Sequence, residues 1–108
     1  MSSDSGEERL QALQELLEDD PSDAFTRYGV AMQLKGLERY VAALAHFKVL
    51  LEEHPDYVAS YYHHAGALHA EGETARALEV IELGCAAAAE QGDRHAQNEL
   101  EDLREELE

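Results

Sequence analysis

Residues 24–57 read AFTRYGVAMQLKGLERYVAALAHFKVLLEEHPDY, and residues 58–91 read VASYYHHAGALHAEGETARALEVIELGCAAAAEQ. Laid over each other, the two stretches are identical at positions that recur with helical spacing. The matched pairs are Tyr28/Tyr62, Ala31/Ala65, Leu34/Leu68, Ala43/Ala77 and Leu44/Leu78, with Phe47 opposite Ile81. A self-similarity at a fixed period of 34 residues indicates a stack of like units, each of which buries an apolar face only against its neighbours.

The segment before these copies matches the second half of the repeat. Residues 7–23 align with residues 41–57, and the identical pairs are Leu10/Leu44, Leu16/Leu50, Leu17/Leu51, Glu18/Glu52 and Pro21/Pro55. The chain therefore divides into a half repeat over 7–23, full repeats over 24–57 and 58–91, and a last segment over 93–107. Residues 1–6 are expected to be a flexible N-terminus before a single domain over 7–108.

Apolar spacing and capping residues predict about six helices. Ser5 and Glu8 have the spacing of a capping box, so the first helix is expected to start near Glu7 and to end before Pro21. Further helices are expected from Ser22 or Asp23 to Gly36, over 38–53, from Asp56 to 71, and over 74–91 with Leu83 inward. After a break and cap at 92–93, Ala96, Leu100, Leu103 and Leu107 form one narrow apolar stripe, typical of a terminal helix that covers one face.

Composition and charge exclude several classes of protein. The 108 residues carry a formal charge of −16, and binding to nucleic acid or anionic lipid needs basic side chains that this chain lacks. The acids concentrate at the two ends, which fits the polar outer faces that a repeat stack needs, although salt adaptation is a second interpretation. Neither a secretory signal nor a membrane-spanning stretch is evident, and Cys85 is the only cysteine, so a cytoplasmic protein is expected.

These features together resemble the tetratricopeptide repeat family. The resemblance rests on Val30-Ala31, Leu34, Ala43 with Phe47 four residues later, and Pro55, and it covers residues 7–91. It implies an all-α solenoid of antiparallel helix pairs in a right-handed superhelix. Arg27 and His64 depart from the family pattern, and matching Ala65 to Leu100 needs an offset of 35.

The resemblance also implies that the first helix of each pair lines a concave, partner-binding face. On this face the small residues Ala59 and Gly66 leave room for an apolar anchor. When the face is continued into the last helix at an offset of 35 residues, it includes Arg94, Gln97, Glu101 and Arg104. The two arginines are placed to bind a carboxylate. The predicted partner-binding residues are Phe25, Tyr28, Met32, Lys35, Tyr62, His69, Arg94 and Arg104. Two readings of the tyrosines stay open, a groove for a ligand or packing between helices. The carboxylate clamp of chaperone-binding family members is not expected, because Tyr28, Met32, Tyr62 and Gly66 replace its lysines and asparagines.

No catalytic residue, cofactor site or metal site is predicted. The chain has no phosphate-binding glycine loop, nucleophile elbow or zinc-protease motif. No two histidines of the middle repeats stand four residues apart on one helix. Adjacent His63 and His64 point about 100° apart on a helix, so one helix cannot offer both to a single metal ion. The leading hypothesis is a non-catalytic module that binds a peptide or helix of an unknown protein on its concave face. The alternative is self-assembly through the leucine faces of the terminal helices, and a monomer is expected over a homodimer.

Overall fold

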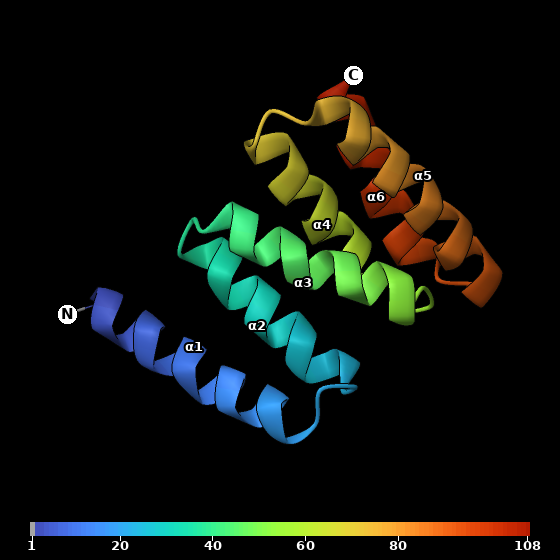
Figure 1. Cartoon of the computed structure of the whole chain (residues 1–108). Helices are drawn as coiled ribbons and strands as arrows, with labels where there is room; N and C mark the ends of the chain where they lie inside the picture. The colour runs from blue at the N-terminus through green and yellow to red at the C-terminus, as the bar shows by residue number, and fades with distance from the viewer. Residues whose placement is uncertain (1) are drawn as a thin grey trace.

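The computed structural model describes residues 2–108, with side chains described from Ser5 onward, and this part of the chain is folded into helices and short turns (Figure 1). The helices are α1 (Ser2–Asp19), α2 (Ala24–Gly36), α3 (Tyr40–Glu53), α4 (Ala59–Ala70), α5 (Thr74–Gln91) and α6 (Arg94–Leu107). Each helix packs on the next one in the chain, α4 also packs on α6, and α2 also approaches α4. The prediction of an all-α solenoid of helix pairs is confirmed.

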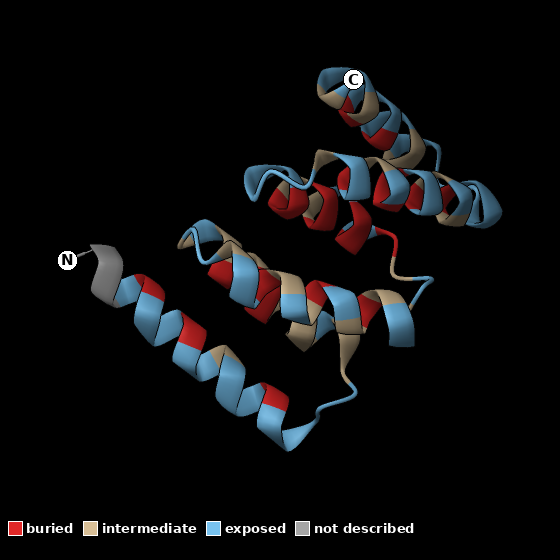
Figure 2. Ribbon diagram, turned by 45° about the horizontal axis from the view of Figure 1, so that its top comes forward, coloured by how far each residue is buried: buried red, intermediate tan, exposed pale blue. Residues whose placement is uncertain are grey.

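Two apolar cores lie along the stack, one in each half. The first is built by α1, α2 and α3 around the fully buried Phe47 and Leu50, with Ala67 of α4 closing it. The second is built by α4, α5 and α6 around Ile81 and Leu100, and Leu44 of α3 packs against both cores. Figure 2 shows the buried residues on the sides of the helices that face one another. Apolar burial between neighbouring helices is therefore what holds the stack together.

The first helix starts earlier than its capping sequence predicts. It begins at Ser2, so Ser5 lies within the helix, and residues 2–6 are helical where a flexible segment was expected; Met1 lies outside the described residues. Contacts with the last turn of α2 and with the turn that follows it explain the difference. The Gln33 side chain donates a hydrogen bond to the carbonyl of Gly6 over 3.2 Å, and Arg39 forms an ion pair with Glu7. Tertiary contacts thus extend the helix past a local cap.

The turns inside the two full repeats use the same backbone geometry with different residues. Gly72, between α4 and α5, has a left-handed φ of 80°, a conformation that costs glycine little. Glu38 occupies the matching position between α2 and α3 with a φ of 61°, and α3 accordingly begins at Tyr40, two residues after the predicted start. The repeat therefore preserves a turn that its first copy fills with an unfavourable residue.

Three helices meet closely at Gly84 in α5. A methyl group added there would lie 2.6 Å from Cβ of Tyr61 in α4 and 2.9 Å from Cδ1 of Leu100 in α6. No real side-chain carbon sits that close to its neighbours, so only glycine fits without a shift of a helix. The structure corrects the inward placement of Leu83, which is 47% exposed, and Leu16, which the repeat matches with the buried Leu50, is 57% exposed. Both lie on the outer sides of helices whose inner faces are already filled.

Within the described residues, no helix is long and apolar enough to span a membrane.

Candidate partner-binding surface

The first helices of the repeats are α2 and α4; α2 approaches α4 and α4 packs on α6, so the three helices form one continuous surface. We call this the α2–α4–α6 surface. It contains a hollow of about 320 Å³ where the three helices come together. The residues that line this hollow are Tyr28, Val58, Ala59, Tyr62, His63, Ala96, Glu99 and Leu100. Tyr28 and Tyr62, matched by the sequence repeat, are therefore brought to one site.

The two tyrosines play different parts in this hollow. Tyr28 is half-buried, and its ring centre lies 5.3 Å from that of Tyr57 and 6.2 Å from that of His63. Burial, followed by the neighbouring Tyr57 hydroxyl, raises the pKa of Tyr28. Tyr62 meets His63 edge to face at 5.2 Å but stays 39% exposed. Tyr28 packs between helices, while Tyr62 presents its ring at the surface.

His63 lies between the tyrosines and has an unused polar atom. Its Nδ1 is buried and has no hydrogen-bond partner among the described residues. Burial lowers the pKa of His63, and the Lys35 ammonium lowers it further, while the Glu99 carboxylate acts in the opposite direction. His63 thus lines the hollow with a ring whose Nδ1 is enclosed by protein and unpaired.

The remaining predicted residues of α2 and α4 lie along the same surface with different exposure. Phe25 is 73% exposed, whereas Met32 is half-buried and packs against the first core. The Lys35 side chain passes over Gly66, since a methyl group at Gly66 would lie 3.5 Å from its Cε. His69 is exposed and lies with Nδ1 3.0 Å from Oγ1 of Thr74. The apolar part of this surface available to a partner is therefore Phe25 and Tyr62.

The placement of Arg104 differs from the prediction. Its guanidinium lies 3.6 Å from Sγ of Cys85 and lines a separate hollow with Leu78, Glu82 and Glu108, on the side of α6 that faces α5. Burial raises the pKa of the Cys85 thiol, and Arg104 opposes that shift. Arg94 is exposed at the first turn of α6 and does not line the hollow. The structure therefore does not bring these arginines together with Tyr62.

Helix register does not account for this difference. Val58 is the N-cap residue of α4 and Asp93 is that of α6, where Asp93 accepts a hydrogen bond from the Ala96 amide over 3.0 Å, so α6 follows α4 at the predicted offset of 35 residues. In this register Leu100 matches Ala65, and both are buried. The Arg104 side chain lies instead against Cys85 of α5, and α6 faces the hollow with Ala96, Glu99 and Leu100.

Sequence reasoning missed His63 and Glu99 as members of the site. His63 stands one position after Tyr62, and Glu99 stands two positions from both Gln97 and Glu101 of the expected face. The repeat was read from residues that match between copies, and His63 is matched by Gly29. A metal role is not supported by geometry, because the described residues contain no group of three or more potential ligands that could hold an ion.

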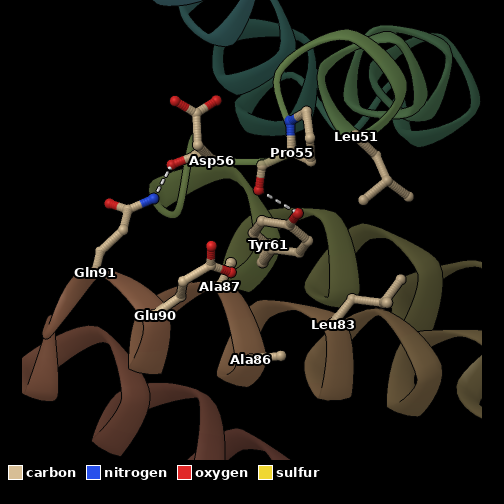
Figure 3. Close-up of a pocket in the computed structure, with 9 residues that line it drawn as sticks. All are labelled: Leu51, Pro55, Asp56, Tyr61, Leu83, Ala86, Ala87, Glu90 and Gln91. Atoms are coloured by element: carbon tan, nitrogen blue, oxygen red, sulfur yellow. Dashed lines mark hydrogen bonds between the residues drawn. The ribbon is translucent and has the colours of Figure 1, made fainter.

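A second and larger hollow lies between α3 and α5, whose backbones do not approach each other in the described structure. Figure 3 shows Leu51 of α3 and Leu83 of α5 reaching into it, with Tyr61 of α4 at its floor. Its volume is about 740 Å³. The other lining residues are Pro55, Asp56, Ala86, Ala87, Glu90 and Gln91. No predicted binding residue belongs to this hollow.

Comparison with known proteins identifies the class. The chain is 35% identical to a tetratricopeptide repeat domain protein from Salinibacter ruber, over 82% of this chain and 90% of that one, with a TM-score of 0.78. A protein from Bordetella parapertussis is 26% identical over 91% of this chain and 85% of that one, with a TM-score of 0.79. This chain belongs to the tetratricopeptide repeat family.

A further structural match extends over nearly the whole chain. The TPR2B domain of yeast Sti1, solved in a complex with pHsp70, has a TM-score of 0.89 over 98% of this chain and 85% of that one, at 24% identity. That likeness shows the fold alone. No family model and no curated protein matches this sequence.

Proposed function

We propose that this chain is a non-catalytic interaction module that binds a peptide or a short helix of a partner protein on the α2–α4–α6 surface. The observation that supports this most directly is the hollow at which Tyr62 remains exposed beside the unpartnered Nδ1 of His63. An exposed aromatic ring at the mouth of a small hollow provides an apolar contact for a partner side chain, which is typical of a contact centre.

The charges at this surface indicate the kind of segment that fits. Glu99 lines the hollow, and the arginines expected to receive a carboxylate lie outside it. A partner segment with a terminal carboxylate is therefore disfavoured, and a neutral or basic segment with an apolar anchor is favoured. The yeast neighbour solved with pHsp70 supports peptide binding by this fold as a general capacity.

A monomer in the cytoplasm is part of the proposal. The leucine faces on which self-assembly would rest are largely used inside the molecule, since Leu10 and Leu17 are buried in the first core and Leu100 and Leu103 in the second. The acidic ends add repulsion between copies. Light scattering over a range of protein concentrations tests this point, and a mass that doubles with concentration contradicts it.

The test of partner binding uses Tyr62→Ala, with Val41→Ala as the matched control. Val41 is 71% exposed on α3, away from the hollow, so both changes remove exposed apolar surface. We expect Tyr62→Ala to lose the proteins that the wild-type chain retains after crosslinking and purification, while helicity measured by circular dichroism is kept. Val41→Ala is expected to retain them. An identical set of captured proteins for both variants refutes the proposed surface.

A further inference from the structure

The hollow between α3 and α5 differs from the matching place one repeat earlier. On α3 the repeat register places Glu52 and Glu53 where α5 has Ala86 and Ala87. The fold accommodates glutamates at these positions in the first copy, where both are exposed. The alanines of α5 are therefore not required by the repeat fold, and they leave the apolar wall of the hollow open.

The hollow is also held in shape by hydrogen bonds of its own. The Tyr61 hydroxyl donates to the Pro55 carbonyl over 2.6 Å, and the Gln91 side chain donates to the Asp56 carbonyl over 2.6 Å (Figure 3). The first bond fixes the turn between α3 and α4 to α4, and the second fixes the same turn to α5. A hollow with a fixed end wall needs little reorganisation to receive a ligand, which lowers the entropic cost of binding.

The rim of this hollow is acidic. Asp56 and Glu90 lie at the end away from Leu83 (Figure 3), and the hollow continues along α5 into a second depression that shares Leu83 and Ala86. That depression is lined by Arg76, Glu79 and Glu82, and the one base among them is paired with Glu79 over 3.3 Å. The apolar floor is thus bordered by carboxylates at both ends, with its only cation already neutralised. Basic side chains on a partner complement this pattern.

We propose that the groove between α3 and α5 is a second docking site, which takes a partner segment with apolar anchors flanked by lysine or arginine. The anchors lie between Leu51 and Leu83 over Tyr61, and the flanking cations meet Asp56 and Glu90 at one end and Glu82 at the other. Its volume of about 740 Å³ falls within the range of pockets that hold compact ligands, enough for a few residues. The site is separate from the α2–α4–α6 surface and does not depend on the function proposed for it.

The variant Ala86→Glu distinguishes binding in the groove from general electrostatic attraction of basic peptides to an acidic protein. The variant restores the residue of the first repeat, and it adds a negative charge while filling the apolar wall. If basic peptides bind only through the charge of −16, the variant binds them slightly more tightly. If they bind in the groove, the affinity of the variant is lower by a factor of about ten or more, because the glutamate side chain fills the space that the apolar anchor would occupy. Ala42→Glu, exposed on α3, is the control that adds charge alone.

The probe is a fluorescein-labelled peptide, acetyl-KKALLKALKK-amide, compared with a peptide in which serine replaces every leucine. We expect saturable fluorescence anisotropy with the leucine peptide and none with the serine peptide. Amide chemical shifts are expected to move around Leu51 and Leu83–Gln91, in wild type and Ala42→Glu but not in Ala86→Glu. Tyr62→Ala leaves this binding unchanged, which distinguishes it from the function proposed above.

Several results overturn the proposal. They are absent binding of the leucine peptide, equal binding of the two peptides, shifts confined to the α2–α4–α6 surface, and undiminished binding by a folded Ala86→Glu variant. A concentration-dependent dimer that Ala86→Glu abolishes also overturns it, because a second copy of the chain is then the occupant.

Discussion

His64 makes the stability of this protein depend on pH in a way that one substitution removes. Its side chain is 5% exposed and stacks on Phe47, with ring centres 5.6 Å apart and planes 11° from parallel. Burial lowers the pKa of His64, the Arg76 guanidinium lowers it further, and the result is about 4. The folded protein therefore holds a neutral imidazole at pH values where an unfolded chain binds a proton.

The sign and size of the effect follow from this difference. An unfolded histidine titrates near pH 6.5, so His64 contributes its full stability above that pH and loses it as the pH falls toward 4. Within this window the free energy of unfolding falls by about 1.4 kcal/mol for each pH unit. Between about pH 7.5 and 5.0, the contribution of His64 to the free energy of unfolding decreases by about 2 kcal/mol. The lower limit keeps the protein above its pI of about 4.5.

The assay is urea denaturation of wild type and His64→Leu at both pH values. Leucine occupies a similar volume and does not titrate, so the stability of the variant relative to wild type is expected to rise by about 2 kcal/mol on acidification. Burial also lowers the pKa of His46 and His63, but both residues are present in each protein and cancel in the comparison. An unchanged pH dependence in His64→Leu refutes the account.

Three further substitutions test the backbone features of the fold. Glu38→Gly removes the strain of a side chain at a left-handed φ and is expected to raise the free energy of unfolding by about 0.5–1 kcal/mol, measured by thermal unfolding. A loss of stability contradicts the turn geometry. Gly84→Ala places a methyl group against Tyr61 and is expected to cost about 1–3 kcal/mol in urea denaturation. Gly66→Ala, where the nearest atom is at ordinary contact distance, is its control and is expected to be neutral or stabilising; equal effects refute the packing argument. Asp93→Ala removes the cap of α6 and is expected to cost about 1 kcal/mol, with the amide protons of the first turn exchanging faster; unchanged exchange contradicts the capping role.

The repeat offset of 34 residues was enough to predict the central helices. Pairs such as Ala43/Ala77 and Leu34/Leu68 are buried in both copies, because close contact between two helices demands the same side-chain size each time. The bounds of α5 and the cap at Asp93 agree with the prediction for the same reason, since both depend on local sequence. Features that recur in sequence are those whose physical cause recurs.

Features that depend on unique contacts were not predictable in this way. The start of α1 is set by its contacts with the end of α2 and the turn that follows, and no repeat position carries that information. The position of Arg104 was not predictable either, because helical spacing does not show that its side chain reaches the Cys85 thiol of α5. The groove at Leu83 escaped notice because helical spacing alone does not tell which apolar residues exceed the space inside a core.

The division of the interior into two cores has a consequence for how the chain assembles during synthesis. Apart from Ala67, every residue of the first core lies between Leu10 and Leu50, so α1, α2 and α3 can pack before the second half of the chain has left the ribosome. The second core forms afterwards against α3, where Leu44 is already in place. The order of translation and the order of folding thus coincide, and little apolar surface stays exposed to solvent until a distant part of the chain is synthesised.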